Sequence, residues 1–143
     1  MRVSAKAEYA CVAMLELAAT RDSTQPVRVK TIAETHRIPL RFLVQILLQL
    51  KGAGLVASTR GASGGYHLTR AAETISVADI INVIDRALPA RAPSSQAAPS
   101  LAFSTLRGIW RDVQVAQQQM LEQITLADLV RQTQESSALS YQI

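Results

Sequence analysis

The first third of the chain alternates between apolar stretches with helical spacing and short polar breaks. In residues 5–19 apolar side chains recur every three or four positions without glycine or proline, which predicts a helix that Ser4 can cap. A short second helix is predicted over residues 30–36. Pro39 opens a third helix that runs to about Lys51, because proline is tolerated in a first helical turn. The predicted buried stripe of this third helix consists of Leu40, Leu43, Ile46, Leu47 and Leu50.

Two short runs with strand character follow this helical segment. Residues 55–59 predict a strand, residues 60–65 a glycine-rich turn, and residues 66–68 the returning strand. Three helices followed by a hairpin are the outline of a winged helix. In that fold the third helix enters the major groove of DNA and the hairpin reaches over the adjacent backbone. The sequence therefore predicts a mainly α fold with a small β wing.

The second half of the chain contains two similar helix starts on either side of a proline-rich segment. Residues 75–80 and 124–129 each combine a Ser or Thr cap, an Asp three residues later and flanking apolar residues. Residues 87–100 hold three prolines and no regular apolar pattern, which predicts a loop. We expect a winged helix-turn-helix DNA-binding domain at residues 1–86, the proline-rich loop, and then a dimerisation helix, a C-terminal helix and a tail at residues 101–143.

A long helix is predicted from Leu101 to about Gln123, and a final helix to about Gln134. Large apolar residues of the long helix recur at alternating three- and four-residue steps, interrupted once at Gln117. Such spacing suits burial against a long partner helix, so this helix is the candidate dimer element. The alternative is an ordinary amphipathic helix that packs on its own domain. The candidate dimer contacts, which we name the seam, are Phe103, Leu106, Trp110, Val113 and Met120.

The composition fits a domain that needs neither a disulfide nor a structural metal. A chain of 143 residues, 48% of them hydrophobic, is long enough to bury a core. Cys11 is the only cysteine, which excludes an internal disulfide, a four-ligand zinc site and a four-cysteine iron–sulfur site within one chain, and His36 and His67 cannot supply the missing ligands. No apolar run of membrane-spanning length lacks charge, and Glu8 and Glu16 interrupt the stretch that would resemble a secretory signal. We therefore expect a cytoplasmic protein.

The charge is distributed unevenly along the chain. The net charge is +4, but the first 70 residues contain ten basic and four acidic residues, whereas the remainder contains five basic and seven acidic residues. A basic N-terminal half suggests a surface that binds a polyanion such as DNA. On charge alone, scatter over a solvated surface is the alternative.

The candidate base-reading residues lie at the start of the predicted third helix. Arg41 can contact guanine and Gln45, one turn later, can contact adenine through paired hydrogen bonds, with a phosphate contact as the alternative for Arg41. Arg37 and Lys51 suit phosphate contacts or plain surface charge. In the hairpin, Arg60 precedes glycines that allow close approach to a phosphate or the minor groove; the alternative is that these glycines serve only the turn. The candidate DNA contacts of the wing are Ser58, Thr59, Arg60, Ser63, Gly64 and Tyr66.

Two stretches of the sequence resemble the Rrf2 family of bacterial winged-helix regulators. Residues 1–10 (MRVSAKAEYA) resemble the opening of the family, and residues 53–56 (AGLV) followed by 60–66 (RGASGGY) resemble its wing. The spacing also agrees through residues 79–81 and on to the long helix. The resemblance implies a homodimeric transcriptional regulator rather than an enzyme. It further implies binding to a dyad-symmetric operator, with Arg60 near the minor groove and the third helix in the major groove.

The sequence departs from the family pattern at two places. Many members hold a [2Fe-2S] cluster on three cysteines after the fourth helix, and residues 87–100 contain none, so we expect no cofactor in this chain. Many members also carry an acidic residue where this sequence has Val44. A carboxylate can accept a hydrogen bond from cytosine and valine cannot, so the operator preference of the family is not carried over.

The cluster-free members that regulate cysteine metabolism resemble this chain in ending with isoleucine. In that system the repressor acts together with cysteine synthase, whose active site accepts the C-terminal isoleucine of a partner, so Ile143 is a candidate contact to cysteine synthase. The alternative is a tail that ends in isoleucine by chance. The leading hypothesis is a homodimeric, sequence-specific DNA-binding transcriptional regulator without an iron–sulfur cluster. Two others stay open: an interaction module that regulates an enzyme through its tail, and a thiol sensor that uses Cys11.

Overall fold

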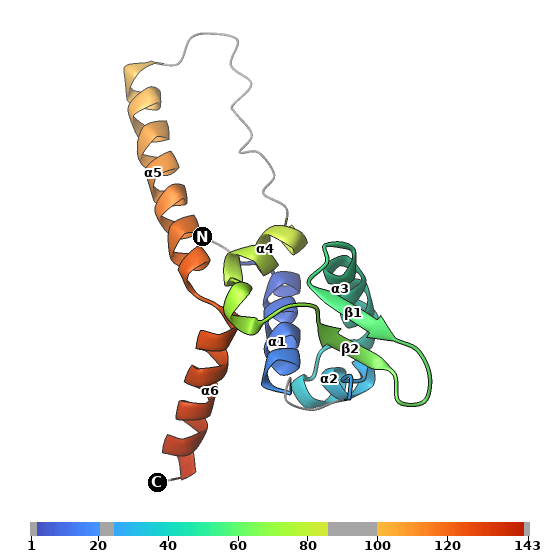
Figure 1. The fold of residues 1–143 in the computed structure, drawn as a ribbon. Coiled ribbons are helices and arrows are strands. Elements are labelled where there is room, and N and C mark those ends of the chain that lie inside the picture. The colour runs from blue at the N-terminus through green and yellow to red at the C-terminus, as the bar shows by residue number, and fades with distance from the viewer. Residues whose placement is uncertain (1–2, 21–24, 86–99, 142–143) are drawn as a thin grey trace.

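A computed structural model describes residues 3–20, 25–85 and 100–141, with side chains described to residue 139 (Figure 1). Its N-terminal part begins with the three predicted helices, α1 (Ala5–Ala19), α2 (Val29–His36) and α3 (Leu40–Gly52). The predicted cap of α1 is confirmed, because Ser4 Oγ accepts a hydrogen bond from the amide of Ala7 at 3.0 Å. The Ser4 hydroxyl also donates to Asp85 Oδ1 at 2.5 Å, which ties the start of α1 to the end of the fourth helix.

A tight break joins α2 to α3. Arg37 ends α2 in the left-handed conformation with φ of 54°, and its amide donates to the carbonyl of Ala33. Pro39 precedes the first residue of α3, as the sequence predicts. The two helices are therefore arranged as a helix-turn-helix, with α3 in the position of the recognition helix.

The predicted wing is present as a two-stranded antiparallel sheet of β1 (Val56–Thr59) and β2 (Gly65–Leu68). Gly61 has a φ of 110°, a conformation that favours glycine, and its carbonyl accepts a hydrogen bond from the amide of Gly64 at 2.9 Å. Tyr66 exchanges two backbone hydrogen bonds with Val27, at 2.8 and 2.9 Å. This bridge fixes the base of the wing to the segment before α2, and the sequence pattern alone did not predict it.

A single core lies between α1, α3 and the fourth helix, α4 (Val77–Asp85), which a short 3-10 turn, η1 (Ala72–Thr74), precedes. We name residues 3–20 and 25–85, which contain these helices and the wing, the head. The largest fully buried side chains are Met14, Ile32, Leu43, Ile46, Leu47, Leu50, Val56, Ile75, Ile80 and Leu126. Among the described residues, no buried side-chain polar atom lacks a hydrogen-bond partner.

The prediction of a buried stripe on α3 is wrong for one residue, Leu40. Leu43, Ile46, Leu47 and Leu50 are buried, but Leu40 is 50% exposed. Leu40 is the first residue of the helix and lies at the border of the stripe, so the core covers only part of its side chain.

Both predicted capping boxes are present. Ser76 and Asp79 exchange two hydrogen bonds of 3.0 Å, and Thr125 and Asp128 exchange two of 3.0 and 3.1 Å. The two boxes also lie next to each other, because Ser76 and Thr125 form an antiparallel bridge. Segments far apart in the sequence therefore meet where the C-terminal part joins the head.

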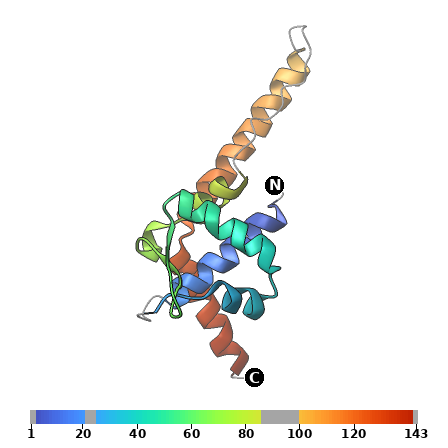
Figure 2. The same ribbon diagram turned by 90° about the vertical axis from the view of Figure 1, so that its right-hand side faces the viewer.

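Two long helices make up the C-terminal part, α5 (Leu101–Gln123) and α6 (Leu126–Tyr141). Figures 1 and 2 show α5 projecting from the head as a single rod. Leu126, the first residue of α6, is fully buried in the core of the head, and α6 packs beside α1 and η1. The helix α6 extends past its predicted end near Gln134, because residues 135–139 contain no glycine or proline that would stop it.

Two of the predictions concern residues that lie outside this description. The predicted loop at 87–100 falls on them except for Ser100, which caps α5 by accepting a hydrogen bond from the Phe103 amide at 3.4 Å. Ile143 also lies outside the described residues. None of the described helices is long enough and apolar enough to cross a membrane.

Candidate nucleic-acid interface

The outward face of α3 carries the two predicted base-reading residues. Arg41 and Gln45 are both exposed and lie one turn apart. The helical period places them opposite the buried stripe that anchors α3 to the core. Figure 1 shows α3 and the wing on one side of α1 and α5 on the other, so α5 does not cover this face. The side chains therefore stand where a major-groove reader holds its base contacts.

Apolar side chains stand beside these two residues, and the sequence analysis did not assign them as candidates. Val44 is 41% exposed and Leu48 is 55% exposed, and Phe42 is also exposed, on the opposite flank of the helix. A signal for them was present in the sequence, because α3 contains more large apolar residues than one buried stripe can hold.

The predicted phosphate contacts flank α3 at its two ends. Arg37 is exposed at the break before α3. Lys51 is exposed in the last turn, and its ammonium group donates a hydrogen bond to Ser58 Oγ in β1 at 2.7 Å. This contact joins the end of α3 to the wing, so the ammonium group and the Ser58 hydroxyl lie at the junction of the two candidate DNA-binding elements.

The wing presents its other predicted residues in two ways. Thr59, Arg60 and Ser63 are exposed at the end of β1 and in the turn, whereas Gly64 and Tyr66 are half-buried. A Cβ atom at position 64 would collide with the carbonyl oxygen of Thr59, so the turn itself requires this glycine. Arg60 is therefore the exposed cation of the wing, while Gly64 shapes the hairpin that carries it.

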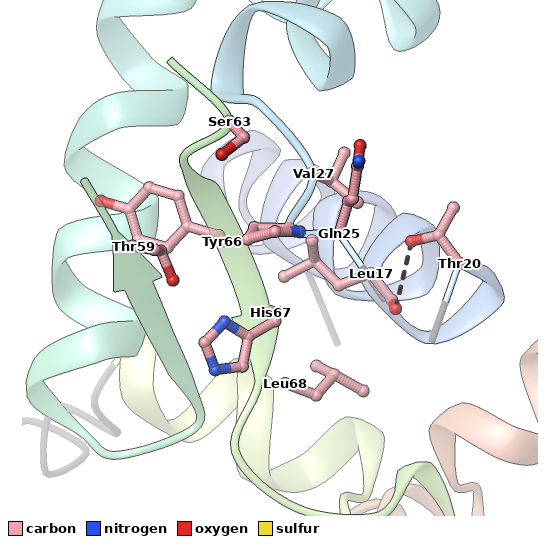
Figure 3. Close-up of a pocket in the computed structure, with 10 residues that line it drawn as sticks. Leu17, Thr20, Gln25, Val27, Thr59, Ser63, Tyr66, His67 and Leu68 are labelled. Atoms are coloured by element: carbon pink, nitrogen blue, oxygen red, sulfur yellow. Dashed lines mark hydrogen bonds between the residues drawn. The ribbon is translucent and has the colours of Figure 1, made fainter. Parts of the chain in front are cut away.

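A half-open cavity of about 540 Å³ lies beside the wing (Figure 3). The end of α1, the segment before α2 and the strands of the wing form its walls, and the Tyr66 ring extends toward Thr59. The described residues of its lining are apolar or uncharged polar ones and include His67, and none of them is Lys, Arg, Asp or Glu. The Thr20 hydroxyl at its edge donates a hydrogen bond to the carbonyl of Glu16 at 2.9 Å.

The two histidines and the cysteine have separate surroundings. His36 Nε2 lies 2.9 Å from Glu16 Oε2 and links α2 to α1, whereas His67 is exposed on the wing. Burial, together with the carboxylates of Asp85 and Glu8, raises the pKa of the Cys11 thiol to about 11. A thiol with so high a pKa is a poor nucleophile and a poor metal ligand at neutral pH. No group of three or more His, Cys, Asp or Glu residues within the described ranges is placed to hold a metal ion.

The seam of α5 is open along its length. All five of its members are exposed, and Trp110 is 60% exposed. No residue of α5 is classed as buried within this chain. The described residues of the same chain thus leave the apolar side chains of this predicted partner-facing stripe largely open to solvent.

The comparisons with known proteins agree with this architecture. The family model described as Rrf2, an iron-dependent transcriptional regulator, matches residues 3–132. The chain belongs to the Rrf2 family. A putative helix-turn-helix transcriptional regulator of Mycobacterium tuberculosis is 39% identical over 133 residues, which cover 90% of this chain and 81% of that protein. The transcriptional regulator IscR of Erwinia tasmaniensis is 35% identical over 131 residues, covering 91% of this chain and 79% of the relative.

Solved structures of Rrf2-type regulators share the fold. CymR, the global cysteine regulator of B. subtilis, superposes with a TM-score of 0.78 at 31% identity and covers 92% of this chain and 97% of its own. IscR of T. potens gives a TM-score of 0.78 at 34% identity and covers 95% of this chain and 90% of its own. The protein is thus a transcriptional regulator with a DNA-binding winged helix, and its relatives are regulators rather than enzymes.

The donor set of this Rrf2 chain does not fit the [2Fe-2S] cluster that the family implies. Thiolates are the usual ligands of such clusters, and the sequence has one cysteine. Cys11 lies in α1 against the core, with its pKa raised, rather than in the segment after α4. No functional step is therefore assigned to a cluster.

Proposed function

We propose that this Rrf2 protein acts as a homodimer that binds a specific DNA sequence without an iron–sulfur cluster. In each copy α3 enters the major groove and the wing contacts the adjacent backbone. The observation that carries the proposal is the placement of Arg41 and Gln45 on the exposed face of α3, beside a wing that holds Arg60 out to solvent.

The proposed dimer accounts for the exposed seam of α5, because a second copy of the chain would cover it. Large apolar side chains along a helix of 23 residues stand exposed in one chain. A parallel or antiparallel pairing of two such helices buries the seams against each other. A two-fold symmetric dimer then presents two α3 helices to two half-sites of a symmetric operator.

Selection of bound duplexes from random DNA tests the function directly. We expect enrichment of a sequence with two-fold symmetry, and affinity that falls steeply as salt rises because several phosphates are neutralised. If no sequence is enriched, the specific-binding proposal is wrong, and an interaction module that keeps the scaffold becomes the better hypothesis.

Two arginine variants separate base reading from backbone contact. If Arg41 reads a base, Arg41→Ala lowers discrimination between the operator and altered sequences by about 1–3 kcal/mol. A uniform loss on all sequences would assign Arg41 to phosphate instead. Arg60→Ala is expected to weaken operator binding in a mobility assay, and unchanged affinity would remove the wing from the interface. Arg131→Ala is the matched control, because Arg131 lies on α6 and pairs with Asp128 at 2.8 Å.

A second candidate function is control through cysteine synthase, with Ile143 as the contact. The observation that favours it is the similarity to CymR, whose name describes a regulator of cysteine. The test is a titration of cysteine synthase with the full chain and with a variant that lacks Ile143, following the fluorescence of the enzyme's pyridoxal phosphate. Binding lost with Ile143 supports the partnership, and no binding by either form refutes it.

A further inference from the structure

The outward face of α3 is chemically mixed. Viewed down the helix axis, the helical period places Leu48 next to Arg41, on the side away from Gln45, and Val44 lies one turn before Leu48. Val44 is 41% exposed and Leu48 is 55% exposed, on the same helix that buries Leu43, Ile46, Leu47 and Leu50. Apolar surface of this kind is unfavourable in water, and free energy is released when an apolar group of a partner covers it.

The charges near the two side chains favour DNA as the partner that packs on them. Arg37, Arg41 and Lys51 are exposed on α3 or at its ends, Arg60 is exposed on the wing, and α3 itself contains no acidic residue. A cationic rim of this kind suits a polyanion. Since α3 has no carboxylate, it lacks the acidic side chain that typically accepts a hydrogen bond from the amino group of cytosine.

The major groove offers one prominent apolar group, the C5 methyl of thymine. Contacts between this methyl and apolar side chains are a known means of reading a T·A pair. We propose that Val44 and Leu48 form an apolar pair that packs on thymine methyl groups, so that each operator half-site carries thymine next to the bases read by Arg41 and Gln45. This inference rests on the proposed DNA-binding function and adds a sequence preference to it.

The test compares thymidine with deoxyuridine, which differ only by the C5 methyl group. Each thymidine of the selected operator is replaced in turn by deoxyuridine, and the dissociation constant of the wild-type protein is measured for each duplex. Loss of one buried methyl is expected to weaken binding about fourfold, and about 15-fold when both symmetric half-sites are changed. Deoxyuridine at thymidines outside the α3 contact should have no effect.

Variants of the protein assign the methyl contact to its side chains. Val44→Ala and Leu48→Ala are expected to weaken binding to the thymidine operator and to reduce the thymidine-to-deoxyuridine ratio toward one. Phe42→Ala is the matched control, because Phe42 is an equally exposed apolar residue on the opposite flank of α3. It should leave the ratio unchanged.

The possible failures are distinguishable. No binding to any duplex would refute the proposed function and this inference together. Tight, sequence-specific binding with equal affinity for thymidine and deoxyuridine duplexes would overturn only the inference. Because that measurement uses the wild-type protein, it does not depend on how the variants fold.

Discussion

The head and α5 both carry large apolar side chains on their helices, but the head buries most of its own and α5 leaves them exposed. In the head, α1, α3 and α4 each bury one face against the others, and several large side chains have no exposed surface. In α5 the members of the seam are all exposed, although they are as large and as apolar as those of the core. The head therefore completes its own core within one chain, whereas the seam of α5 stays exposed within the described part of the chain.

This difference also separates the two tasks of the protein. In the head, the hydrogen bond between Lys51 and Ser58 joins the end of α3, the helix that carries Arg41, to the wing. If two copies pair through α5 as proposed, this helix sets the spacing of the two heads without changing the face that each presents to DNA. Substitutions in the two regions should accordingly have different consequences.

The largest effect is expected for Trp110→Asp in the seam. Burying an unpaired carboxylate in a dimer interface costs several kcal/mol, so the dimer dissociation constant should rise at least about 1000-fold. Sedimentation equilibrium measures this dissociation constant. Gln119→Asp is the control, because Gln119 is exposed on α5 but does not belong to the seam. A dimer that survives Trp110→Asp would show that α5 is not the dimer element.

The next effect should appear only in the head. Leu50 is fully buried, and Leu50→Ala removes core contacts and leaves a cavity, which should lower the free energy of unfolding by about 2–5 kcal/mol. Urea unfolding followed by circular dichroism measures this loss. Phe103→Ala removes a larger side chain from α5, yet its effect on unfolding should be much smaller at concentrations where the protein is monomeric. Equal losses for the two variants would contradict the division between head and α5.

The local features of both regions were predictable from the sequence, and the contacts between distant segments were not. A capping box depends on residues three positions apart, so the boxes at Ser76 and Thr125 were visible in the pattern. The bridge between these two boxes, and the one between Val27 and Tyr66, join segments far apart in the sequence, and no local pattern records them.

For the candidate site, the sequence predicted the exposed polar residues and missed the exposed apolar ones. Arg41 and Gln45 were assigned because their hydrogen-bonding groups suggest bases. Val44 and Leu48 were not, because their side chains have no hydrogen-bonding group that suggests a base. Only the packing of α3 on α1 and α4 separates the leucines that are buried from Leu40 and Leu48, which are exposed.

A third prediction uses Cys11 as a reporter of the head. Because burial raises its pKa to about 11 from an ordinary value of 9.0, the thiolate fraction near pH 8 should be about 100-fold smaller than in the unfolded chain. Alkylation by iodoacetamide should slow by a similar factor and accelerate as pH rises toward 11. The protection should persist in Trp110→Asp, since it arises within the head. Equal alkylation rates in the folded and unfolded chains would instead favour the thiol-sensor hypothesis.

A fourth prediction compares the caps on the two sides of the bridge. Ser76→Ala and Thr125→Ala each remove a side-chain acceptor from a helix start and should lower the free energy of unfolding by about 1 kcal/mol. The bridged boxes join the C-terminal part to the head. The free energy of unfolding of the double variant should therefore fall by more than the sum of the two single decreases. Strict additivity, measured by urea unfolding of all three variants, would mean that the two boxes act independently.

The smallest effect is expected at Asp128, on the α6 side of the bridge. The amide and hydroxyl of Thr125, and more weakly Arg131, hold the pKa of this carboxyl below its ordinary value of 3.8. A lowered pKa in the folded state means that the stabilisation is present above that ordinary value and is lost as pH falls through the lowered one. The difference in melting temperature between the wild type and Asp128→Asn should therefore shrink between about pH 6 and about pH 3. The exposed pair of Arg131 with Asp128 contributes little, so Arg131→Ala should reproduce only a small part of that difference. A difference that stays constant with pH would show that the Thr125 hydrogen bonds do not favour the charged carboxylate, and that the second box stabilises α6 through geometry alone.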